Sequence, residues 1–220
     1  MATAKKPGGT RRKSKPRDPE KKVIDAAMKL AAEKGWANLS LAEIGEAAGL
    51  DFKDLFAVAP SKSAILEALS RRVDAEVLSE GPLDAGDGSA RDRLFDVLMR
   101  RFDALLPYRE GLGEVIYDLR RHPLEALMEG PGLRRSLAWM LEAAGIDSSG
   151  LKGLLRVKAL SAIYLMSLRV WLKDDTADLS KTMAALDGYL RRLEPWAERF
   201  EGAGSRHAPS SHDETAKDVS

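Results

Sequence analysis

The sequence of 220 residues contains no cysteine, which excludes a disulfide framework, a thiolate nucleophile and any metal site with cysteine ligands. Histidine is scarce as well. Two of the three histidines, His207 and His212, lie in a polar C-terminal tail, which leaves His122 alone in the body of the chain. Without a histidine pair at ligand spacing, and with Asp174 and Asp175 better explained as a helix end, we expect no metal.

Catalytic and membrane signatures are missing too. The chain has no phosphate-binding Walker loop, no Gly-x-Ser-x-Gly elbow and no dinucleotide fingerprint, so we predict that the protein is not an enzyme and needs no cofactor. No apolar run approaches the roughly 18 residues of a membrane span, and residues 1–22 lack the apolar centre of a secretory signal. The expected location is the cytoplasm.

Charge is unevenly distributed although the net charge is only +1. Residues 1–22 contain nine basic residues against Asp18 and Glu20, whereas the rest of the chain is mildly acidic. Residues 1–17, which we call the basic arm, are rich in glycine, proline, serine and threonine and poor in apolar residues. We expect the basic arm and residues 201–220 to be disordered, because neither can bury enough apolar surface to offset its ordering entropy.

Apolar residues recur at helical spacing, and no segment alternates in the way typical of a strand. Asp18 followed by Pro19 indicates a helix start, and Gly35 indicates its end. Ser40 and Glu43 form a capping box for a short second helix. The pattern predicts an all-α fold.

The most specific pattern lies between Leu41 and Leu55. Gly45 is a small residue where two helices can cross, and Gly49 four residues later suits a left-handed turn. Apolar residues stand at the positions that fix the angle between two such helices, namely Ile44, Ala48, Leu50 and Leu55. An ordinary helical hairpin is the alternative, but the coincidence of turn, caps and small residue favours a helix-turn-helix.

These features resemble the TetR family of bacterial regulators. The resemblance is carried by Gly35 and Trp36, by the segment 41–58, and by Pro60, Ser61 and Lys62 before the next helix. It covers residues 20–80 and implies a DNA-bound dimer with an effector site in its second domain. A turn-rich break at residues 81–88 completes the expected organisation: basic arm 1–17, helix-turn-helix domain 18–80, helical ligand-binding and dimerisation domain 81–200, and tail 201–220.

The second helix of the motif departs from the family pattern. Where the family usually carries a polar pair and an aromatic, this chain has Ala57, Val58 and Ala59, none of which can donate a hydrogen bond to a base or a phosphate. Phe56 is expected to pack inward with Leu55, while part of the remaining apolar surface faces outward. The residues predicted to contact DNA are Arg11, Arg12, Lys13, Ser40, Lys53, Phe56 and Lys62.

A second resemblance concerns the C-terminal half. Residues 105–110, 158–164 and 171–178, with Leu186 and Asp187, are similar to stretches of a lipid-binding accessory family of coenzyme Q (ubiquinone) biosynthesis that shares the TetR fold. That resemblance implies an accessory factor that holds an isoprenoid or phospholipid and has no specific DNA readout.

Aromatic residues in the second domain could line a pocket for an apolar small molecule or lipid, although core packing is the commoner role for each. The predicted ligand-binding residues are Phe102, Tyr117, Trp139, Tyr164 and Trp171. Residues 151–172 and 178–200 are two long apolar helices, and two copies of them could form a four-helix bundle. The favoured interpretation is a homodimeric TetR-type transcriptional regulator, and the alternative is the lipid-binding accessory factor.

Overall fold

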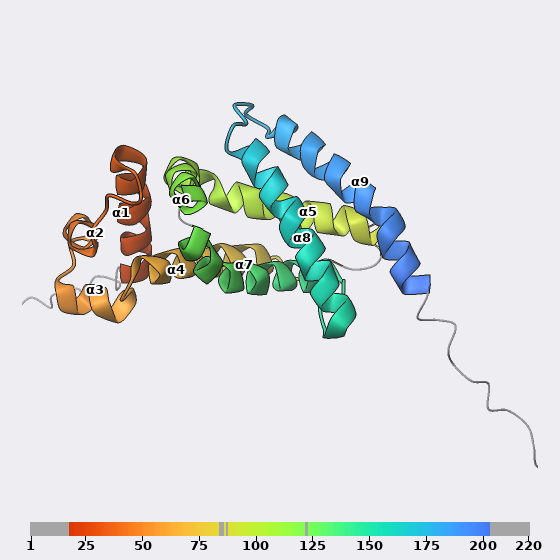
Figure 1. Cartoon of the computed structure of the whole chain (residues 1–220), viewed down its shortest axis with the longest axis horizontal. Helices are drawn as coiled ribbons and strands as arrows, with labels where there is room; N and C mark the ends of the chain where they lie inside the picture. Colours follow the sequence, from red (N-terminus) through yellow and green to blue (C-terminus); the bar gives the residue numbers. More distant parts are fainter. Residues whose placement is uncertain (1–17, 84–85, 87, 122, 203–220) are drawn as a thin grey trace, which may run out of the picture. The chain divides into compact units, whose positions relative to one another are not determined.

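The computed structural model describes residues 18–83, 86, 88–121 and 123–202, so the basic arm, with Arg11, Arg12 and Lys13, lies outside the described residues. Within those ranges every regular element is helical, which confirms the predicted all-α fold. The helices, shown in Figure 1, are α1 (Pro19–Lys34), α2 (Leu41–Ala48), α3 (Phe52–Val58), α4 (Lys62–Leu78), α5 (Ala90–Leu105), a short 3-10 turn (Leu106–Tyr108), α6 (Arg109–Arg121), α7 (Pro123–Ala143), α8 (Gly150–Trp171) and α9 (Ser180–Gly202).

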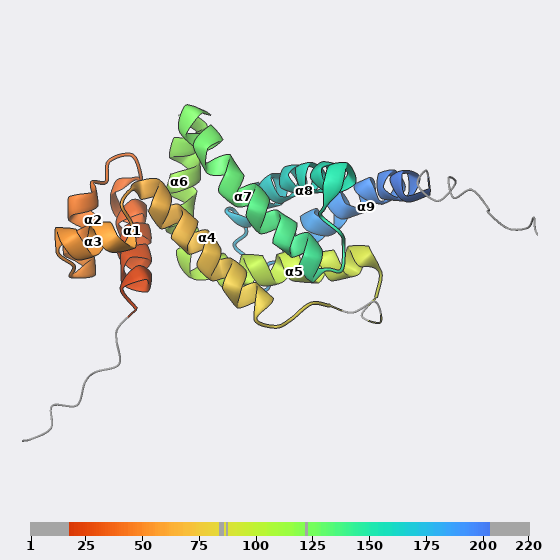
Figure 2. The same ribbon diagram turned by 90° about the horizontal axis from the view of Figure 1, so that it is seen from below.

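The described chain divides into two compact units. The first contains residues 18–69 together with Glu110–Asp118, and the second contains Ser70–Arg109 and the residues from Leu119 onward. Helix α4 therefore begins in the first unit and ends in the second (Figure 2). The segment 81–88, where the sequence suggested a boundary, lies within the second unit.

Local sequence fixes the first unit. The Asp18 carboxylate accepts the N–H of Lys21 at 3.1 Å and caps α1, and Gly35, with a φ of 81°, ends it. The apolar face of α1 is buried against α2 and α3 through Val23, Ile24, Ala27, Met28 and Ala31. Helix α6 also contacts α1 closely, because a Cβ at Gly111 would lie only 2.3 Å from the carbonyl oxygen of Met28. The two backbones can approach this closely only where the side chain is a hydrogen.

The second unit is built on α5, α7, α8 and α9. Helices α8 and α9 run side by side, and α5 packs against both α7 and α9 (Figure 1). Its largest fully buried side chains are Leu98, Phe102, Leu137, Met140, Trp171 and Leu186. Leu186 is thus part of the core of its own chain and is not on a surface that a second copy could contact.

Helix α7 contains a proline in its interior. Pro131 lies inside α7, although proline is best tolerated in the first turn of a helix. A proline in a helix interior removes one backbone hydrogen bond and costs about 3 kcal/mol. The burial of Leu137, Met140 and Leu141 in the same helix supplies apolar stabilisation that offsets this cost.

Candidate nucleic-acid interface and ligand site

The helix-turn-helix begins with a complete capping box. Ser40 Oγ accepts the N–H of Glu43 at 3.2 Å, and the Glu43 carboxylate accepts the N–H of Ser40 at 3.0 Å. Lys34 Nζ reaches the same carboxylate at 3.0 Å and ties the end of α1 to α2. The Ser40 backbone hydrogen bond, with Lys34 and the Ser40 hydroxyl, lowers the pKa of Glu43 from 4.5 to about 2. Ser40, a predicted DNA contact, is exposed and already serves as this cap.

The turn between α2 and α3 has the geometry that the sequence predicts. Gly49 ends α2 with a φ of 67°, in the left-handed region, and Asp51 caps α3 by accepting the N–H of Asp54 at 2.8 Å. At the crossing of the two helices a Cβ on Gly45 would lie 3.1 Å from Leu55 Cδ2. A larger side chain there would push the helices apart, so the small residue sets how closely they pack.

Lys62, a predicted phosphate contact, is bound to the loop between α1 and α2. Its Nζ donates hydrogen bonds to the carbonyl oxygens of Trp36 at 2.5 Å and Leu39 at 3.2 Å, and it lies 4.8 Å from the centroid of the Trp36 ring. An ammonium group has three protons, and two of them are committed to this loop. We therefore assign Lys62 to holding the connection between α1 and α2. Lys53, by contrast, is exposed on α3.

The surface of α3 is more apolar than the sequence suggested. Leu55 is buried, but Phe52 and Phe56 are each 71% exposed, so the expectation that Phe56 packs inward is wrong. Both Leu55 and Phe56 are apolar, and in a helix of seven residues periodicity does not decide which of two adjacent apolar residues faces the core. The outward position of Phe52 agrees with the expected outward apolar surface.

Sequence reasoning missed the contribution of α6 to the first unit. Asp118 on α6 accepts the N–H of Ala37 in the loop after α1 at 2.5 Å, across 81 residues of sequence. Together with the close approach at Gly111, this bond fixes α6 against α1. No local pattern in the sequence predicts either contact, because the residues that form them are ordinary helix and loop residues far apart along the chain.

Three of the five predicted ligand residues come together in the second unit. The Phe102 ring stacks on Tyr164 with centroids 5.4 Å apart and lies 5.8 Å from Trp171, and all three side chains are buried. We call these three the aromatic cluster. Tyr117 is 54% exposed and belongs to the first unit, and Trp139 is 55% exposed on α7, so neither joins the cluster.

A buried ion pair lies next to the aromatic cluster, and the sequence did not reveal it. Arg101 on α5 pairs with Asp74 on α4 and donates from Nε to the hydroxyl oxygen of Tyr164 at 3.3 Å. Ser136 on α7 donates to the same carboxylate of Asp74 at 2.7 Å. Burial by itself would lower the pKa of Arg101, but Tyr164 and Asp74 outweigh burial and raise the pKa. The charged form is therefore the one that the core holds.

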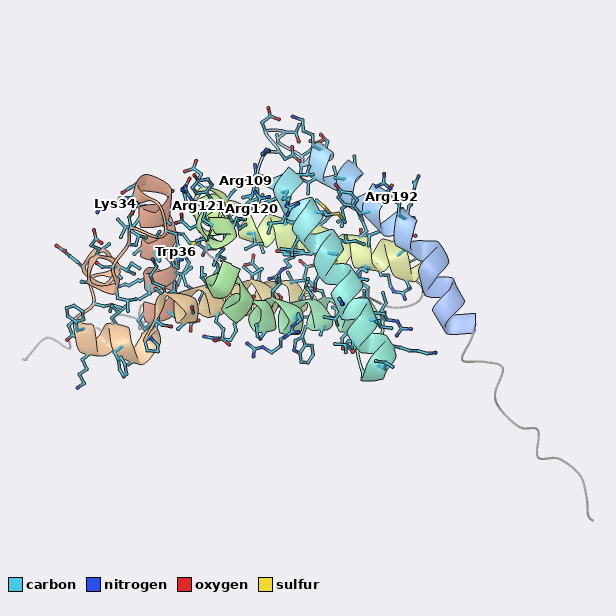
Figure 3. The ribbon with its side chains drawn as sticks, viewed as in Figure 1. Lys34, Trp36, Arg109, Arg120, Arg121 and Arg192 are labelled. Carbon is cyan, nitrogen blue, oxygen red and sulfur yellow. The ribbon has the colours of Figure 1, made fainter. Side chains whose placement is uncertain are left out.

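Other polar groups surround Trp171. The guanidinium of Arg109 lies 4.8 Å from the centroid of the Trp171 ring and donates to the carbonyl oxygen of Asp174 at 2.6 Å (Figure 3). Among the described residues, Trp171 Nε1, Ser167 Oγ and Arg109 Nε are buried without a hydrogen-bond partner. Buried polar groups are normally paired, so these atoms could bind an acceptor on a ligand or a water.

The aspartates that precede α9 stabilise a helix start. Asp174 accepts hydrogen bonds from the hydroxyls of Thr176 at 2.5 Å and Thr182 at 2.6 Å, and Asp175 pairs with Lys181 at 2.5 Å. Burial raises the pKa of Asp174, but these hydrogen bonds outweigh it and hold the pKa well below its usual range. In the part of the chain that the structure describes, no three histidine, aspartate or glutamate side chains are grouped to hold a metal.

No helix in the described ranges is both long and apolar enough to span a bilayer.

Comparison with known proteins gives a family match for the helix-turn-helix. Residues 23–69 match the model for bacterial regulatory proteins of the tetR family. Over those residues the match confirms the resemblance inferred from the sequence. Among curated proteins, a sequence search finds no match.

Solved structures show the same fold over most of the chain. A TetR transcriptional regulator from Nitrosomonas europaea is 24% identical with a TM-score of 0.62, and the match covers 80% of this chain and 98% of that one. A TetR regulator from Rhodococcus sp. RHA1 is 21% identical with a TM-score of 0.55, covering 80% and 97%. A tetR-family regulator from Streptomyces coelicolor is 17% identical with a TM-score of 0.54, covering 84% and 86%. The fold is TetR-like, and the resemblance to the coenzyme Q accessory family stays an untested prediction.

Proposed function

We propose that the protein is a transcriptional regulator that binds DNA as a homodimer and responds to a small apolar ligand. The observation that carries the proposal is the complete helix-turn-helix within residues 23–69, with its capping box, its left-handed turn and an outward-facing second helix. A helix presented in this way can enter a major groove while the preceding helix crosses the backbone.

The basic arm supplies most of the electrostatic attraction to DNA in this proposal. Residues 18–69 contain six lysines against nine acidic residues, so the helix-turn-helix body is itself acidic. The basic arm contains seven basic residues and no acidic one. Because phosphate contacts release counterions, binding that depends on the arm will weaken steeply as salt is raised.

An apolar stripe on α8 supports the homodimer. Leu151, Leu154, Leu155, Leu165 and Met166 are 38–75% exposed. Lys158 and Ala162, which are also exposed, lie between Leu155 and Leu165. With these two residues included, each exposed residue is one, three or four positions from the next, so the set follows one face of α8. A soluble chain seldom leaves such a face in water, and two copies of α8 with the adjacent α9 could cover it in a four-helix bundle.

The aromatic cluster supports the ligand response. A ligand with an apolar body and a hydrogen-bond acceptor would match both the three rings and the buried donors Trp171 Nε1 and Ser167 Oγ. Tyr164 also touches Arg101, which is paired with Asp74 on α4, the helix that begins in the helix-turn-helix unit. The ligand response is tested by screening apolar compounds that carry an acceptor group for release of bound DNA. Trp171→Phe, which deletes the indole N–H, should lower the affinity of any compound that releases the DNA.

Selection of DNA by the purified full-length protein tests the regulator directly. Random duplexes are retained on the protein at about physiological salt, sequenced and selected again. We expect enrichment of a motif with two related half-sites, because a dimer places two copies of α3 on the duplex. Deletion of residues 1–17 should weaken binding to all sequences alike. Absence of enrichment, combined with association of the protein with phospholipid vesicles, would support the accessory factor instead.

A further inference from the structure

The outward face of α3 combines two aromatic rings with one cation. Successive residues of a helix are about 100° apart, which places Phe52 and Phe56 on one flank of α3, about 60° and 100° round the helix from the buried Leu55. Lys53 and Ala57 follow them on the side turned away from Leu55, so the four exposed side chains form one continuous arc. Asp54 lies on the opposite flank of the helix. The Asp51 carboxylate is occupied by its hydrogen bond to the N–H of Asp54. This face, which we call the phenylalanine face, is thus apolar with a single positive charge.

The chemistry of the phenylalanine face restricts what it can recognise on DNA. Base edges in the major groove present hydrogen-bond donors and acceptors, and the 5-methyl group of thymine is the one apolar group among them. A phenyl ring pressed on a polar base edge would remove water and return no hydrogen bond, which is unfavourable. Against a thymine methyl the same ring buries apolar surface on both partners.

We propose that Phe52 and Phe56 recognise thymine methyl groups and so determine the DNA sequence that the protein selects. This inference rests on the proposed function. DNA is the occupant that fits, because the rings lie on the outward surface of a helix-turn-helix and Lys53 stands beside them at a position where it can meet a phosphate. Phe52 and Phe56 are four residues apart, about 6 Å along a helix, which is close to two base-pair steps of about 3.4 Å. Each half-site should therefore contain two thymines separated by about two steps.

Replacing thymine by deoxyuridine in the selected duplex tests the inference. The replacement deletes the methyl group and leaves the hydrogen-bonding groups of the base unchanged. We expect each replacement under the phenylalanine face to raise Kd about fourfold, the equivalent of one buried methyl group. Deoxyuridine outside the half-sites serves as the DNA control and should leave Kd unchanged.

Variants of α3 connect the methyl effect to the two rings. Phe52→Ala and Phe56→Ala should bind the thymine duplex more weakly and lose the difference between thymine and deoxyuridine at the corresponding position. Lys53→Ala is the matched control on the same face, and it should weaken both duplexes equally and make binding less salt-dependent. Because both phenylalanines are 71% exposed, their removal should leave the melting temperature of the protein unchanged.

The outcomes separate this inference from the proposed function. If the wild type retains a selected duplex but binds its deoxyuridine form equally well, the methyl recognition is wrong and the regulator stands. A methyl effect that persists in both phenylalanine variants overturns the inference in the same way. If the wild type selects no duplex at all, the proposed function fails and the inference fails with it.

Discussion

Removing the carboxylate of Asp74 should destabilise the protein far more than removing a surface carboxylate nearby. Arg101 is 3% exposed and Asp74 is 15% exposed, and Ser136 also donates to Asp74. In Asp74→Ala the guanidinium keeps only neutral partners, the hydroxyls of Tyr164 and Ser70, each at 3.3 Å. Breaking a buried pair from one side costs about 3–5 kcal/mol, because the remaining charge stays buried without a counterion.

A neighbouring pair supplies the control. Arg100, the residue before Arg101, pairs with Glu80 at 2.9 Å, but these side chains are 29% and 57% exposed. Water solvates both groups, so Glu80→Ala should cost less than about 1 kcal/mol. For a chain of this size 1 kcal/mol changes the melting temperature by about 2–4 °C. We therefore expect Asp74→Ala to lower it by about 6–20 °C and Glu80→Ala by at most about 4 °C.

Thermal unfolding followed by far-ultraviolet circular dichroism measures both variants. The double variant Asp74→Leu with Arg101→Met should recover most of the lost stability, because it removes the charges and keeps the apolar volume. Equal shifts for Asp74→Ala and Glu80→Ala would refute the reasoning, since burial would then not control the cost. A double variant no more stable than Asp74→Ala alone would refute it as well.

Three further predictions concern the two units. Gly111→Ala places a methyl group against the backbone of Met28 and should lower the free energy of unfolding by about 1–3 kcal/mol. A methyl group at Gly188 would have no atom within 4 Å, so Gly188→Ala should stabilise its helix by up to about 1 kcal/mol. The melting temperatures of the two variants compare these effects. Because the pKa of Glu43 is lowered to about 2, its stabilising effect is complete above about pH 4.5 and is lost as the pH falls towards 2. Urea unfolding at several pH values measures this loss of stability, which should be smaller in Glu43→Gln. Leu165→Glu should give monomers in sedimentation velocity, and Leu106→Glu, an equally exposed leucine outside α8, should leave a dimer; a monomeric wild type would contradict the α8 interface.

Local signals in the sequence predicted the helix-turn-helix well. The caps at Asp18, Ser40 and Asp51 and the turn at Gly49 depend on side-chain and backbone bonds within four residues, so the amino acids at those positions determine the structure. The predicted helix around residues 151–172 also agrees with α8, because its apolar residues extend without a breaking residue.

Contacts between distant segments could not be predicted in this way. The Arg101–Asp74 pair and the approach of Gly111 to Met28 depend on which helices pack together, and a single sequence gives no register between helices. Lys62 shows the same limit. A lysine beside a helix-turn-helix suggests a phosphate contact, and only the folded loop shows that two carbonyl oxygens bind its ammonium group.

The sequence also could not show which of the predicted ligand residues lie together in the fold. Aromatic residues in helices are usually core residues, and composition does not tell which of them meet. Phe102, Tyr164 and Trp171 face inward from α5 and α8, while Tyr117 and Trp139 lie on exposed faces of α6 and α7. The sequence also could not predict that Trp171 Nε1 and Ser167 Oγ are buried without a hydrogen-bond partner, because that depends on how their helix packs.

The most direct test of the regulator compares two duplexes at about 150 mM salt, by fluorescence anisotropy with the full-length protein. One duplex carries the selected motif and the other has the same bases in scrambled order. The account predicts that the selected duplex binds about 10³ times more tightly, at the low end of specific DNA binding, because apolar contacts to methyl groups replace hydrogen bonds to bases. Equal affinity for both duplexes would contradict it, since the basic arm alone would then explain all binding.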